Sequence, residues 1–245
     1  MHEPFHVIIP ARLGSTRLPA KLLADIGGQP AISYTWKSAC ASGAAQVLIA
    51  ACGSELADVA QGFGADTCLT DPELPSGTDR CLAACQHLPL HDHSIIVNVQ
   101  GDELLMPPTA IAAVGQALSE SNCDIATLAQ PISVAESQLP QRVKVVTALN
   151  GQALYFSRAA IPWDAAAGQI SRQAQHHLGI YAYRLQTLKK FADLPPSALE
   201  QTEKLEQLRA LEQGMSIHVA SSPQHVPPGL DTAEDLERIR GVLAP

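Results

Sequence analysis

One stretch near the start, residues 5–21 (FHVIIPARLGSTRLPAK), limits more than any other what this chain can fold into. Its first part, residues 5–9, is an apolar run of strand length that ends at Pro10, and the loop that follows holds a glycine, two hydroxyl side chains and three cations. In an open α/β sheet, ligands bind beyond the carboxyl ends of the strands. A loop of this composition can turn its backbone N–H groups towards an anion, while Arg and Lys add charge. Since it matches neither of the two familiar glycine-rich phosphate motifs, the loop alone predicts either a phosphate site or an exposed basic loop.

The following residues alternate strands and helices as far as residue 121. Strand-like apolar runs lie at 47–51, 66–69 and 94–100. Helical segments lie at 30–42, 54–63, 78–87 and 107–121. This β-α-β-α alternation predicts a mainly parallel sheet that helices cover on both faces.

The pattern changes after residue 121, where strands dominate. Strand-like segments follow at 125–130, 143–149, 153–157 and 177–184. Asn150-Gly151, between two of these segments, is a strong hairpin signal. The remaining elements are helices at 185–192, 200–212 and 232–243 and a strand at 217–221. We therefore expect one α/β domain, residues 1–245, with an insertion lobe that spans about 125–190.

Composition excludes several classes of protein. With 245 residues, 46% of them hydrophobic and 16% charged, the chain is long and apolar enough for a large ordered core. A net charge of −8 argues against a nucleic-acid-binding surface, which is basic. No apolar run approaches the ~18 residues of a membrane span, and the N-terminus has no signal-peptide core. The cysteines form no C-x-x-C pair and are interpreted as buried apolar residues of a reducing compartment, so we expect a cytoplasmic protein without membrane contact.

Two further loops could bind an anion and a metal ion. Residues 76–80, SGTDR, open a helix whose free N–H groups favour an anion, although Ser76 or Thr78 could be an ordinary N-cap. In residues 99–103, VQGDE, a glycine and two carboxylates follow a buried strand, which suits Mg²⁺ together with phosphate oxygens and water. The alternative is a turn with solvated carboxylates, but Gln100 ends an apolar strand and can point into a cleft.

Two acidic segments late in the chain are also candidates. In SALEQTEKLEQLR, Glu203 and Glu206 lie one turn apart near an apolar helical stripe, and a solvated charged face is the alternative. In GLDTAED, Thr232 and Asp235 have the spacing of a capping box. Asp231 is not needed for that box, so it is a candidate second carboxylate for the metal.

A series of motifs in fixed order spans about residues 6 to 241. The motifs are PAR-x-x-STRLP-x-K at 10–21, SGTDR at 76–80, NVQGDE at 98–103, VKVV at 143–146, ALYFSRA-x-IPWD at 153–164, HLGIY at 177–181, LEQLR at 205–209 and LDTAEDLERIR at 230–240. Together they resemble the 3-deoxy-manno-octulosonate cytidylyltransferase family of Gram-negative bacteria. The resemblance implies a three-layer α/β/α, Rossmann-like nucleotidyltransferase fold. Its central sheet would be mixed and mainly parallel, and its strand-rich middle segment would be a dimerisation arm.

The resemblance also implies an activity. The anomeric hydroxyl of 3-deoxy-D-manno-octulosonate (Kdo) would attack the α-phosphorus of CTP and give CMP-Kdo and pyrophosphate, with Mg²⁺ as cofactor. This transferase step activates Kdo for lipopolysaccharide biosynthesis. Transfers of this type depend mostly on positioning and charge neutralisation, so we expect no obligatory side-chain base. The enzyme would be a cytoplasmic homodimer.

The resemblance carries roles over to individual residues. The catalytic set is Arg12, Lys21, Asp102 and Asp231. The two aspartates would hold the metal, and the two cations would hold the CTP phosphates and the leaving pyrophosphate. The nucleotide-binding set is Ala11, Arg12, Lys21, Ser76, Gly77, Arg80 and Asp102. The Kdo-binding set is Arg17, Gln100, His177, Tyr181, Glu206 and Gln207.

The sequence departs from the family pattern at some positions near these sites. Ala20 stands where the family usually has glycine, and Leu104 stands where proline usually follows QGDE. His176 replaces a lysine or arginine before HLGIY, and Ala165 follows IPWD where an arginine would contact the sugar tail. The last two departures bear on recognition of that tail.

Three other functions stay open on the sequence alone. A cytidylyltransferase for 8-amino Kdo, a sialic acid or another acidic sugar would differ only in specificity, and HLGIY and IPWD favour Kdo. A dinucleotide-dependent oxidoreductase would need a glycine fingerprint that the cationic first loop lacks. A non-catalytic nucleotide- or sugar-binding protein would have lost a metal ligand, and both candidate aspartates are present.

Overall fold

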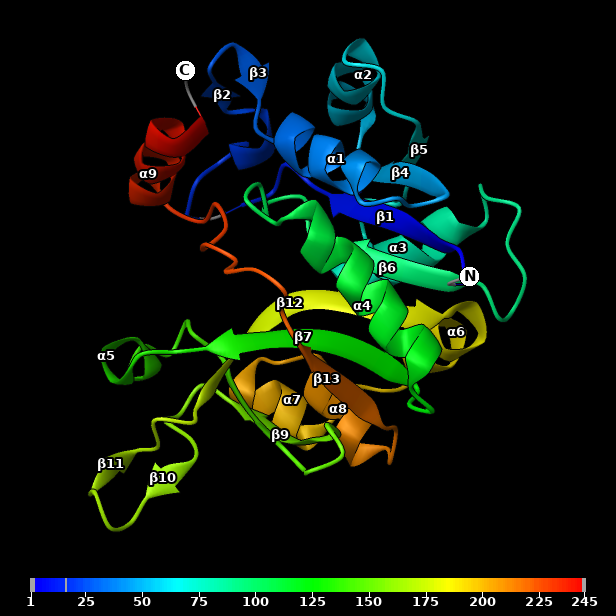
Figure 1. Cartoon of the computed structure of the whole chain (residues 1–245). Helices are drawn as coiled ribbons and strands as arrows, with labels where there is room; N and C mark the ends of the chain where they lie inside the picture. Colours follow the sequence, from blue (N-terminus) through cyan, green and yellow to red (C-terminus); the bar gives the residue numbers. More distant parts are fainter. Residues whose placement is uncertain (1–2, 16, 244–245) are drawn as a thin grey trace.

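A mixed β-sheet forms the centre of the molecule, and the computed structural model describes residues 3–15 and 17–243, which leaves Thr16 of the opening loop outside the described residues (Figure 1). The strands of the sheet are β1 (Phe5–Ala11), β4 (Gln46–Ala51), β5 (Thr67–Leu69), β6 (Ile95–Val99), β7 (Ile125–Pro131), β8 (Lys144–Thr147), β9 (Ala153–Ser157), β12 (Gln175–Arg184) and β13 (Ile217–Ser221). Their order is β13-β7-β12-β6-β1-β4-β5, and β8 and β9 extend the sheet from β12. The pairs around β1, β4 and β5 and the pair of β7 with β13 are parallel, whereas β12 is antiparallel to both neighbours. The expected mixed, mainly parallel sheet is confirmed.

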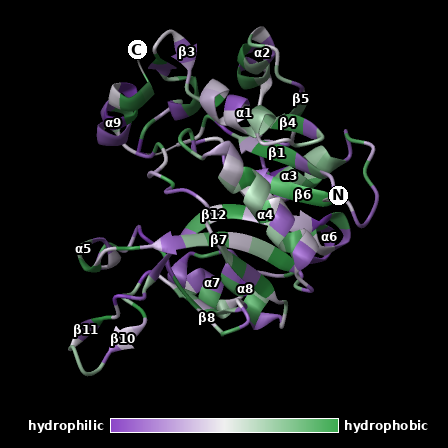
Figure 2. Cartoon of the chain, viewed as in Figure 1, coloured by the Kyte–Doolittle hydropathy of each residue, from purple (hydrophilic) through white to green (hydrophobic). Residues whose placement is uncertain are grey.

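Helices cover both faces of this sheet, as the alternation of elements predicts. The helices are α1 (Ile32–Ala41), α2 (Ser54–Gly62), α3 (Gly77–Cys85), α4 (Pro108–Glu120), α5 (Val134–Ser137), α6 (Leu185–Ala192), α7 (Ala198–Glu203), α8 (Gln207–Glu212) and α9 (Ala233–Leu243). Successive side chains of a strand point to opposite faces. Val7 and Ile9 pack in one core with α1, α2 and α4, and Ile8 packs in a second core with α3, α6 and α8. Hydrophobic residues are accordingly concentrated along the central strands, including β1, β6 and β12 (Figure 2).

The direction of the strands explains which loops meet. The parallel strands β1 and β6 end at the same edge of the sheet, where the loops with Arg12 and Asp102 begin. Because β12 is antiparallel to β6, with Ile180 opposite Val99, its amino-terminal half brings His177 to that edge as well. Residues from the two halves of the chain are thereby collected in one place.

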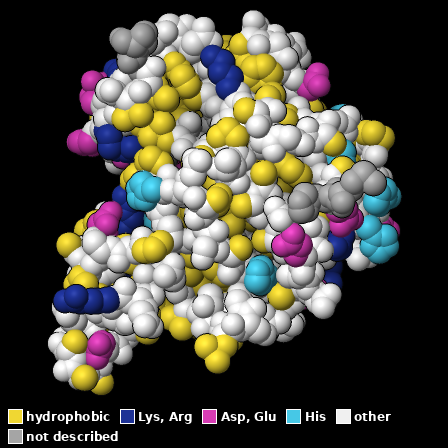
Figure 3. Space-filling view, viewed as in Figure 1, with side chains coloured by type: hydrophobic (Ala, Val, Ile, Leu, Met, Phe, Trp, Pro, Cys, Tyr) yellow, Lys and Arg dark blue, Asp and Glu magenta, His cyan; other side chains and the backbone are white. Residues whose placement is uncertain are grey.

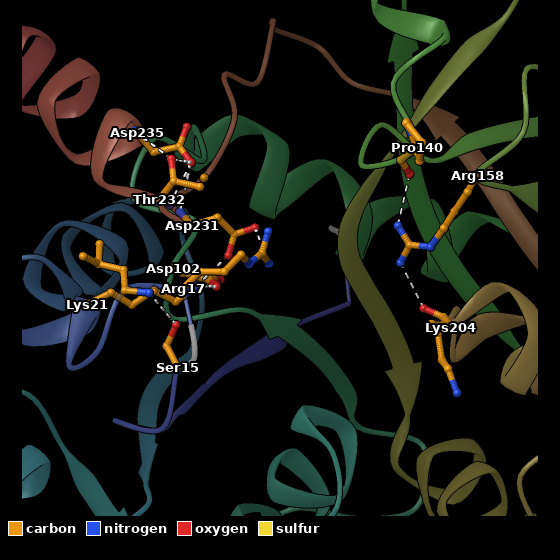
Figure 4. Close-up of polar contacts among 12 residues, drawn as sticks. Ser15, Arg17, Lys21, Asp102, Pro140, Arg158, Lys204, Asp231, Thr232 and Asp235 are labelled. Atoms are coloured by element: carbon orange, nitrogen blue, oxygen red, sulfur yellow. Dashed lines mark hydrogen bonds and ion pairs between the residues drawn. The ribbon is translucent and has the colours of Figure 1, made fainter.

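The expected single helix at 200–212 is wrong, because the chain forms α7 and α8 with a break at Lys204. Lys204 has a left-handed backbone, with φ 54°, which ends α7. Arg158 stabilises the break, since its Nε donates to the Glu203 carbonyl at 2.6 Å and its Nη2 to the Lys204 carbonyl at 3.1 Å (Figure 4). Its Nη1 also donates to the carbonyl of Pro140 at 3.1 Å.

The middle of the chain contains one expected hairpin and one that the sequence did not predict. Strands β8 and β9 are joined at Asn150-Gly151 as expected, and Gly151 has a φ of +82° that glycine tolerates. Short strands β10 (Trp163–Asp164) and β11 (Gln169–Ile170) form a second hairpin that projects from the body of the molecule (Figure 1). The sequence also gave no signal for α5 or for the small β2–β3 turn of Asp25–Ile26 with Gln29–Pro30.

The cysteines are buried only in part, although the sequence analysis interpreted them as buried residues. Cys68, Cys81 and Cys85 are buried, but Cys40 is exposed, so the interpretation of the cysteines as buried residues is wrong for part of the set.

On the face drawn in Figure 3, Lys and Arg side chains are scattered singly and form no continuous basic stripe. Within the described ranges, no helix is both long enough and apolar enough to cross a membrane.

The departure at Ala20 has a structural cost. Ala20 adopts φ 52° and ψ 28°, a left-handed conformation that glycine adopts freely and that crowds the β-carbon of alanine. We expect Ala20→Gly to raise the free energy of unfolding by about 1 kcal/mol, measured by urea denaturation. The control is Ala24→Gly in the same loop. Ala24 has φ −56°, so this variant should instead be less stable than the original chain. Equal effects of the two substitutions would contradict the assignment of strain to Ala20.

Candidate functional site

Four charged side chains from three separate loops meet at the edge of the sheet (Figure 4). Lys21 Nζ donates to Asp102 Oδ2 at 2.6 Å and to Asp231 Oδ1 at 2.8 Å, and Arg17 Nη2 lies 3.1 Å from Asp231 Oδ2. Burial by itself lowers the pKa of Lys21, but the two carboxylates outweigh burial and raise it. Lys21 therefore stays protonated and holds two like charges close together.

Tight backbone packing brings the two aspartates within reach of Lys21. Leu230 N donates to the carbonyl oxygen of Asp102 at 2.9 Å. A β-carbon at Gly229 would lie 2.9 Å from that same oxygen and 3.2 Å from the carboxyl group of Glu103. Only glycine lets the two loops approach so closely, and this approach places Asp231 beside Asp102.

The expected capping box beyond Asp231 is present at the start of α9. The Asp235 carboxylate accepts from Thr232 N at 3.1 Å, and Asp235 N donates to Thr232 Oγ1 at 3.2 Å. Arg238 pairs with the same carboxylate at 2.9 Å. The carboxylate of Asp235 therefore caps α9, whereas the carboxylate of Asp231 pairs with Lys21 and Arg17.

Two adjoining cavities contain the predicted nucleotide-binding residues. The loop cavity, of about 610 Å³, lies between the opening loop and the end of β6 and is lined by Arg12, Lys21 and Asp102 among others. The cap cavity, of about 110 Å³, shares Pro10, Arg12 and Gln100 with it. Its other walls are Ala11, Leu74, Pro75, Ser76, Gly77 and Arg80. Every residue predicted to bind the nucleotide lines one of these two cavities.

Several of these side chains also have structural partners. Ser76 is the N-cap of α3, since its Oγ accepts from Thr78 N and Asp79 N at 3.1 Å each. Gly77 is packed against Gln100, whose Oε1 would lie 2.9 Å from an added β-carbon. Arg80 is 3% exposed and donates to the hydroxyl of Thr70 and to the carbonyl of Asp71 at 3.1 Å. The structural interpretation of SGTDR as a capped helix start is therefore correct, alongside its position at the cavity.

The sheet cavity, of about 640 Å³, lies on the other side of the aspartates. It shares Arg17, Asp102 and Asp231 with the loop cavity. From the predicted sugar-binding set, His177, Tyr181 and Gln207 also line it. Gln100 instead lines the loop and cap cavities, and Glu206 lines none of the three.

His177 is held in a fixed, neutral state. Its side chain is buried, with Nε2 3.0 Å from Thr127 Oγ1 and the ring edge-on to Phe156 at 4.9 Å between centroids. Burial lowers the pKa of His177 to about 3. Burial likewise raises the pKa of neighbouring Tyr181, and the charge of Glu206 adds to this shift. Both rings therefore offer neutral hydrogen-bonding groups at pH 7.

Glu206 joins the two sides of the site. Its Oε2 accepts from Thr78 Oγ1 at 2.5 Å, so the start of α8 is tied to the start of α3. Burial raises the pKa of Glu206, although the hydrogen bond from Thr78 opposes this. The buried atoms Glu206 Oε1, Gln207 Nε2 and Asn98 Nδ2 have no hydrogen-bond partner among the described residues. Unpaired buried polar atoms call for a partner, and a bound ligand would provide one.

Two features of the sheet cavity were not predicted from the sequence. Glu103 faces the cavity instead of solvent, and burial, with the charges of Asp102 and Asp231, raises its pKa to about 8. Arg142, just before the VKVV motif, also lines the cavity. The proximity of Arg142 to VKVV was the available signal, whereas the burial of Glu103 depends on the distant loop at Gly229.

The donor atoms of Asp102 and Asp231 fit a small divalent cation. Mg²⁺ binds hard oxygen ligands and usually takes one or two carboxylates together with substrate phosphates and water. The side chains of Asp102 and Asp231 are 31% and 47% exposed, and both face the cavities. Across the described part of the chain, no group of three or more His, Cys, Asp or Glu side chains could hold a metal by itself. The two carboxylates would supply part of a Mg²⁺ ligand set, with phosphate oxygens and water as the remaining ligands.

Comparison with known proteins identifies the family. Residues 6–217 match the family described as Cytidylyltransferase. The 3-deoxy-manno-octulosonate cytidylyltransferase of Aeromonas salmonicida is 46% identical over 256 residues, which cover 98% of this chain and 99% of that relative. The enzyme of the same name from Haemophilus influenzae is 44% identical over 250 residues, which cover 98% of each chain.

Solved structures agree with these relatives. CMP:2-keto-3-deoxy-manno-octonic acid synthetase, solved in complex with CTP, superposes with a TM-score of 0.89 at 36% identity and covers 98% of each chain. A nucleotidyl transferase from Methanothermobacter thermautotroptrophicus has a TM-score of 0.62 at 14% identity, which supports the fold alone. The chain therefore belongs to the cytidylyltransferase family and, within it, to the 3-deoxy-manno-octulosonate cytidylyltransferases.

Proposed function

We propose that this enzyme transfers the cytidylyl group of CTP to the anomeric hydroxyl of Kdo, releasing pyrophosphate and so activating Kdo for lipopolysaccharide biosynthesis. The observation that carries the proposal is that the loop cavity and the sheet cavity meet at Asp102, Asp231 and Arg17. A two-substrate transfer needs one site for each substrate and a shared boundary where the reacting atoms approach. The family relationship supplies the two substrates, since the relatives are named for the Kdo reaction and the solved neighbour holds CTP.

The two cavities would divide the substrates between them. The triphosphate would lie in the loop cavity, with Arg12 and Lys21 neutralising its charge, and the base would enter the cap cavity near Ala11, Ser76, Gly77 and Arg80. Kdo would lie in the sheet cavity against His177, Tyr181 and Gln207. Glu206 would act indirectly, because its hydrogen bond to Thr78 fixes the position of α8 relative to α3.

The chemical step follows from this placement. The anomeric oxygen of Kdo forms a bond to the α-phosphorus of CTP, the bond from that phosphorus to the bridging oxygen breaks, and pyrophosphate leaves with the electron pair. The hydroxyl proton passes to water in the same step. Arg12 and Lys21 bind the leaving pyrophosphate, and Arg17 lies at the boundary between the two substrates. Positioning and charge neutralisation supply most of the rate enhancement in reactions of this kind.

Asp102 and Asp231 would hold Mg²⁺ at this boundary. A divalent cation bound there would neutralise phosphate charge and orient the reacting groups. Lys21 keeps the two carboxylates together, so the protein's own residues preserve the donor pair before substrate enters.

The proposal extends to assembly and location. We propose a cytoplasmic homodimer built from one α/β domain, in which the lobe at about 125–190 forms the contact between subunits. Large apolar side chains on this lobe support the idea, since Leu154 and Trp163 are both 61% exposed. The β10–β11 hairpin that carries Trp163 extends away from the sheet (Figure 1).

Pyrophosphate release from CTP and Mg²⁺ tests the main proposal. We expect release with Kdo, and much slower release with 8-amino Kdo or N-acetylneuraminate under the same conditions. Release with 8-amino Kdo alone would retain the chemistry and reassign the acceptor. No release with any of the three sugars would contradict the proposed activity.

A further inference from the structure

Arg142 is a cation in the sheet cavity that the family motifs do not include. It precedes β8 and lines the cavity together with His176 and His177. Its side chain forms no hydrogen bond and no ion pair within 4.0 Å with any residue that the structure describes. The carboxylates of Glu136 and Glu103 are near enough for their pKa values to respond to its charge, but neither forms an ion pair with it. The guanidinium therefore has unused donors beside a large cavity.

The backbone that carries Arg142 is fixed. Arg142 N donates to the carbonyl of Leu139 at 3.0 Å, and the next residue, Val143, accepts from His177 N at 2.8 Å. Lys144 is completely buried, and its Nζ donates to the carbonyl of Leu139 at 3.3 Å and to that of Arg158 at 2.7 Å. The side chain of Arg142 therefore extends from a fixed backbone position directly beside His177.

Among the side chains of the sheet cavity that can carry a positive charge, Arg142 is the one suited to bind a ligand carboxylate. Arg17 is already paired with Asp231. Burial lowers the pKa of His177 to about 3, and burial, with the positive charge of Arg142 as a smaller cause, lowers that of His176 to about 4. Both histidines are thus neutral at pH 7. A carboxylate entering this cavity would need a cation, and Arg142 can supply one without giving up another partner.

The sequence departure at His176 agrees with this assignment. Where the family resemblance leads one to expect lysine or arginine, this chain has a histidine that is neutral at pH 7. In the sheet, His176 is paired with Lys144, two residues after Arg142. The positive charge missing from β12 is therefore present on the neighbouring segment that leads into β8.

We propose that Arg142 binds the carboxylate of the sugar acid and thereby makes the enzyme select anionic acceptors. The inference rests on the proposed function and adds to it a specificity-determining residue outside the expected sugar-binding set. A guanidinium can donate two parallel hydrogen bonds to one carboxylate, and such charge-assisted pairs are stronger than neutral ones.

Steady-state kinetics of three variants test the assignment. We expect Arg142→Gln to raise the KM for Kdo by about 10- to 100-fold, the range that corresponds to loss of a hydrogen bond to a charged group. The KM for CTP should not change. Arg142→Lys keeps the charge but not the forked geometry, so its KM for Kdo should be intermediate. Lys37→Gln is the control, because Lys37 is exposed and lies outside both the cavity and the proposed subunit contact, and it should behave as the original enzyme.

A neutral acceptor separates a direct contact from a general change of the cavity. The methyl ester of Kdo lacks the carboxylate charge, so the original enzyme should bind it more weakly than Kdo in calorimetry. Arg142→Gln should then cause little further loss with the ester. An unchanged KM for Kdo in Arg142→Gln, or equal losses with Kdo and its ester, would overturn the inference while leaving the proposed function intact. Failure of the original enzyme to use any sugar acid would instead overturn the proposed function itself.

Discussion

Asp102→Asn is expected to lower kcat for pyrophosphate release by about a thousandfold, because a metal that neutralises phosphate charge supplies several kcal/mol of transition-state stabilisation. Asparagine keeps the size of the side chain but removes the negative charge. The backbone contact of Asp102 with Leu230 should survive, so the fold and the loop at Gly229 should be retained. The measurement is initial rate against Mg²⁺ concentration at saturating CTP and Kdo.

The control is Asp66→Asn, an exposed aspartate outside all three cavities described above, which should keep full activity. Thermal unfolding of both variants checks that neither loses its fold. If Asp102→Asn kept the rate and the Mg²⁺ dependence of the original enzyme, the metal site would have to be elsewhere. Partial recovery at high Mg²⁺ would support a weakened site, with Asp231 still able to contribute.

Lys21→Met is expected to lower kcat by about a hundredfold, in line with removal of one preorganised charge from a transition state. Lys21 is 12% exposed and touches both candidate metal ligands, so its replacement also leaves two carboxylates without their shared cation. Two unneutralised carboxylates repel each other and attract a divalent ion. The variant should therefore gain more thermal stability from added Mg²⁺ than the original enzyme does.

The matched substitution for this test is Lys190→Met, at an exposed lysine at the far end of α6, which should change neither rate nor Mg²⁺ response. The two readouts separate two roles of Lys21. A slow variant with an ordinary Mg²⁺ response would indicate that Lys21 acts on phosphate alone. A variant with full kcat would remove Lys21 from the catalytic set.

Much of the site followed from the sequence because the chemistry is concentrated at strand ends. The run before Arg12 and the run before Asp102 are apolar, short and bounded by Pro or Gly, so both strands and their loops could be located. The spacing of Thr232 and Asp235 separated the capping residue from Asp231. Local patterns of this kind need no knowledge of distant contacts.

The features that the sequence did not reveal all depend on long-range packing. Lysine is a good helix former, so nothing local marks Lys204 as a break, and its left-handed backbone is stabilised by Arg158 from another element. The burial of Glu103 arises from the loop at Gly229, more than a hundred residues away. Arg142 stood next to a recognised motif, but its place in a cavity depends on the fold of the whole sheet.

The reversed direction of β12 has a consequence for how such an enzyme can change. The cap cavity is built from residues before position 103, whereas most of the sheet cavity wall comes from residues after 140. With the substrates divided between the cavities as proposed, the two substrate preferences are encoded in different halves of the gene. Selection for a new acceptor can change the second half of the gene, while the need to bind the same nucleotide limits change in the first half. Related enzymes that share a donor but differ in acceptor should accordingly diverge unevenly along their length.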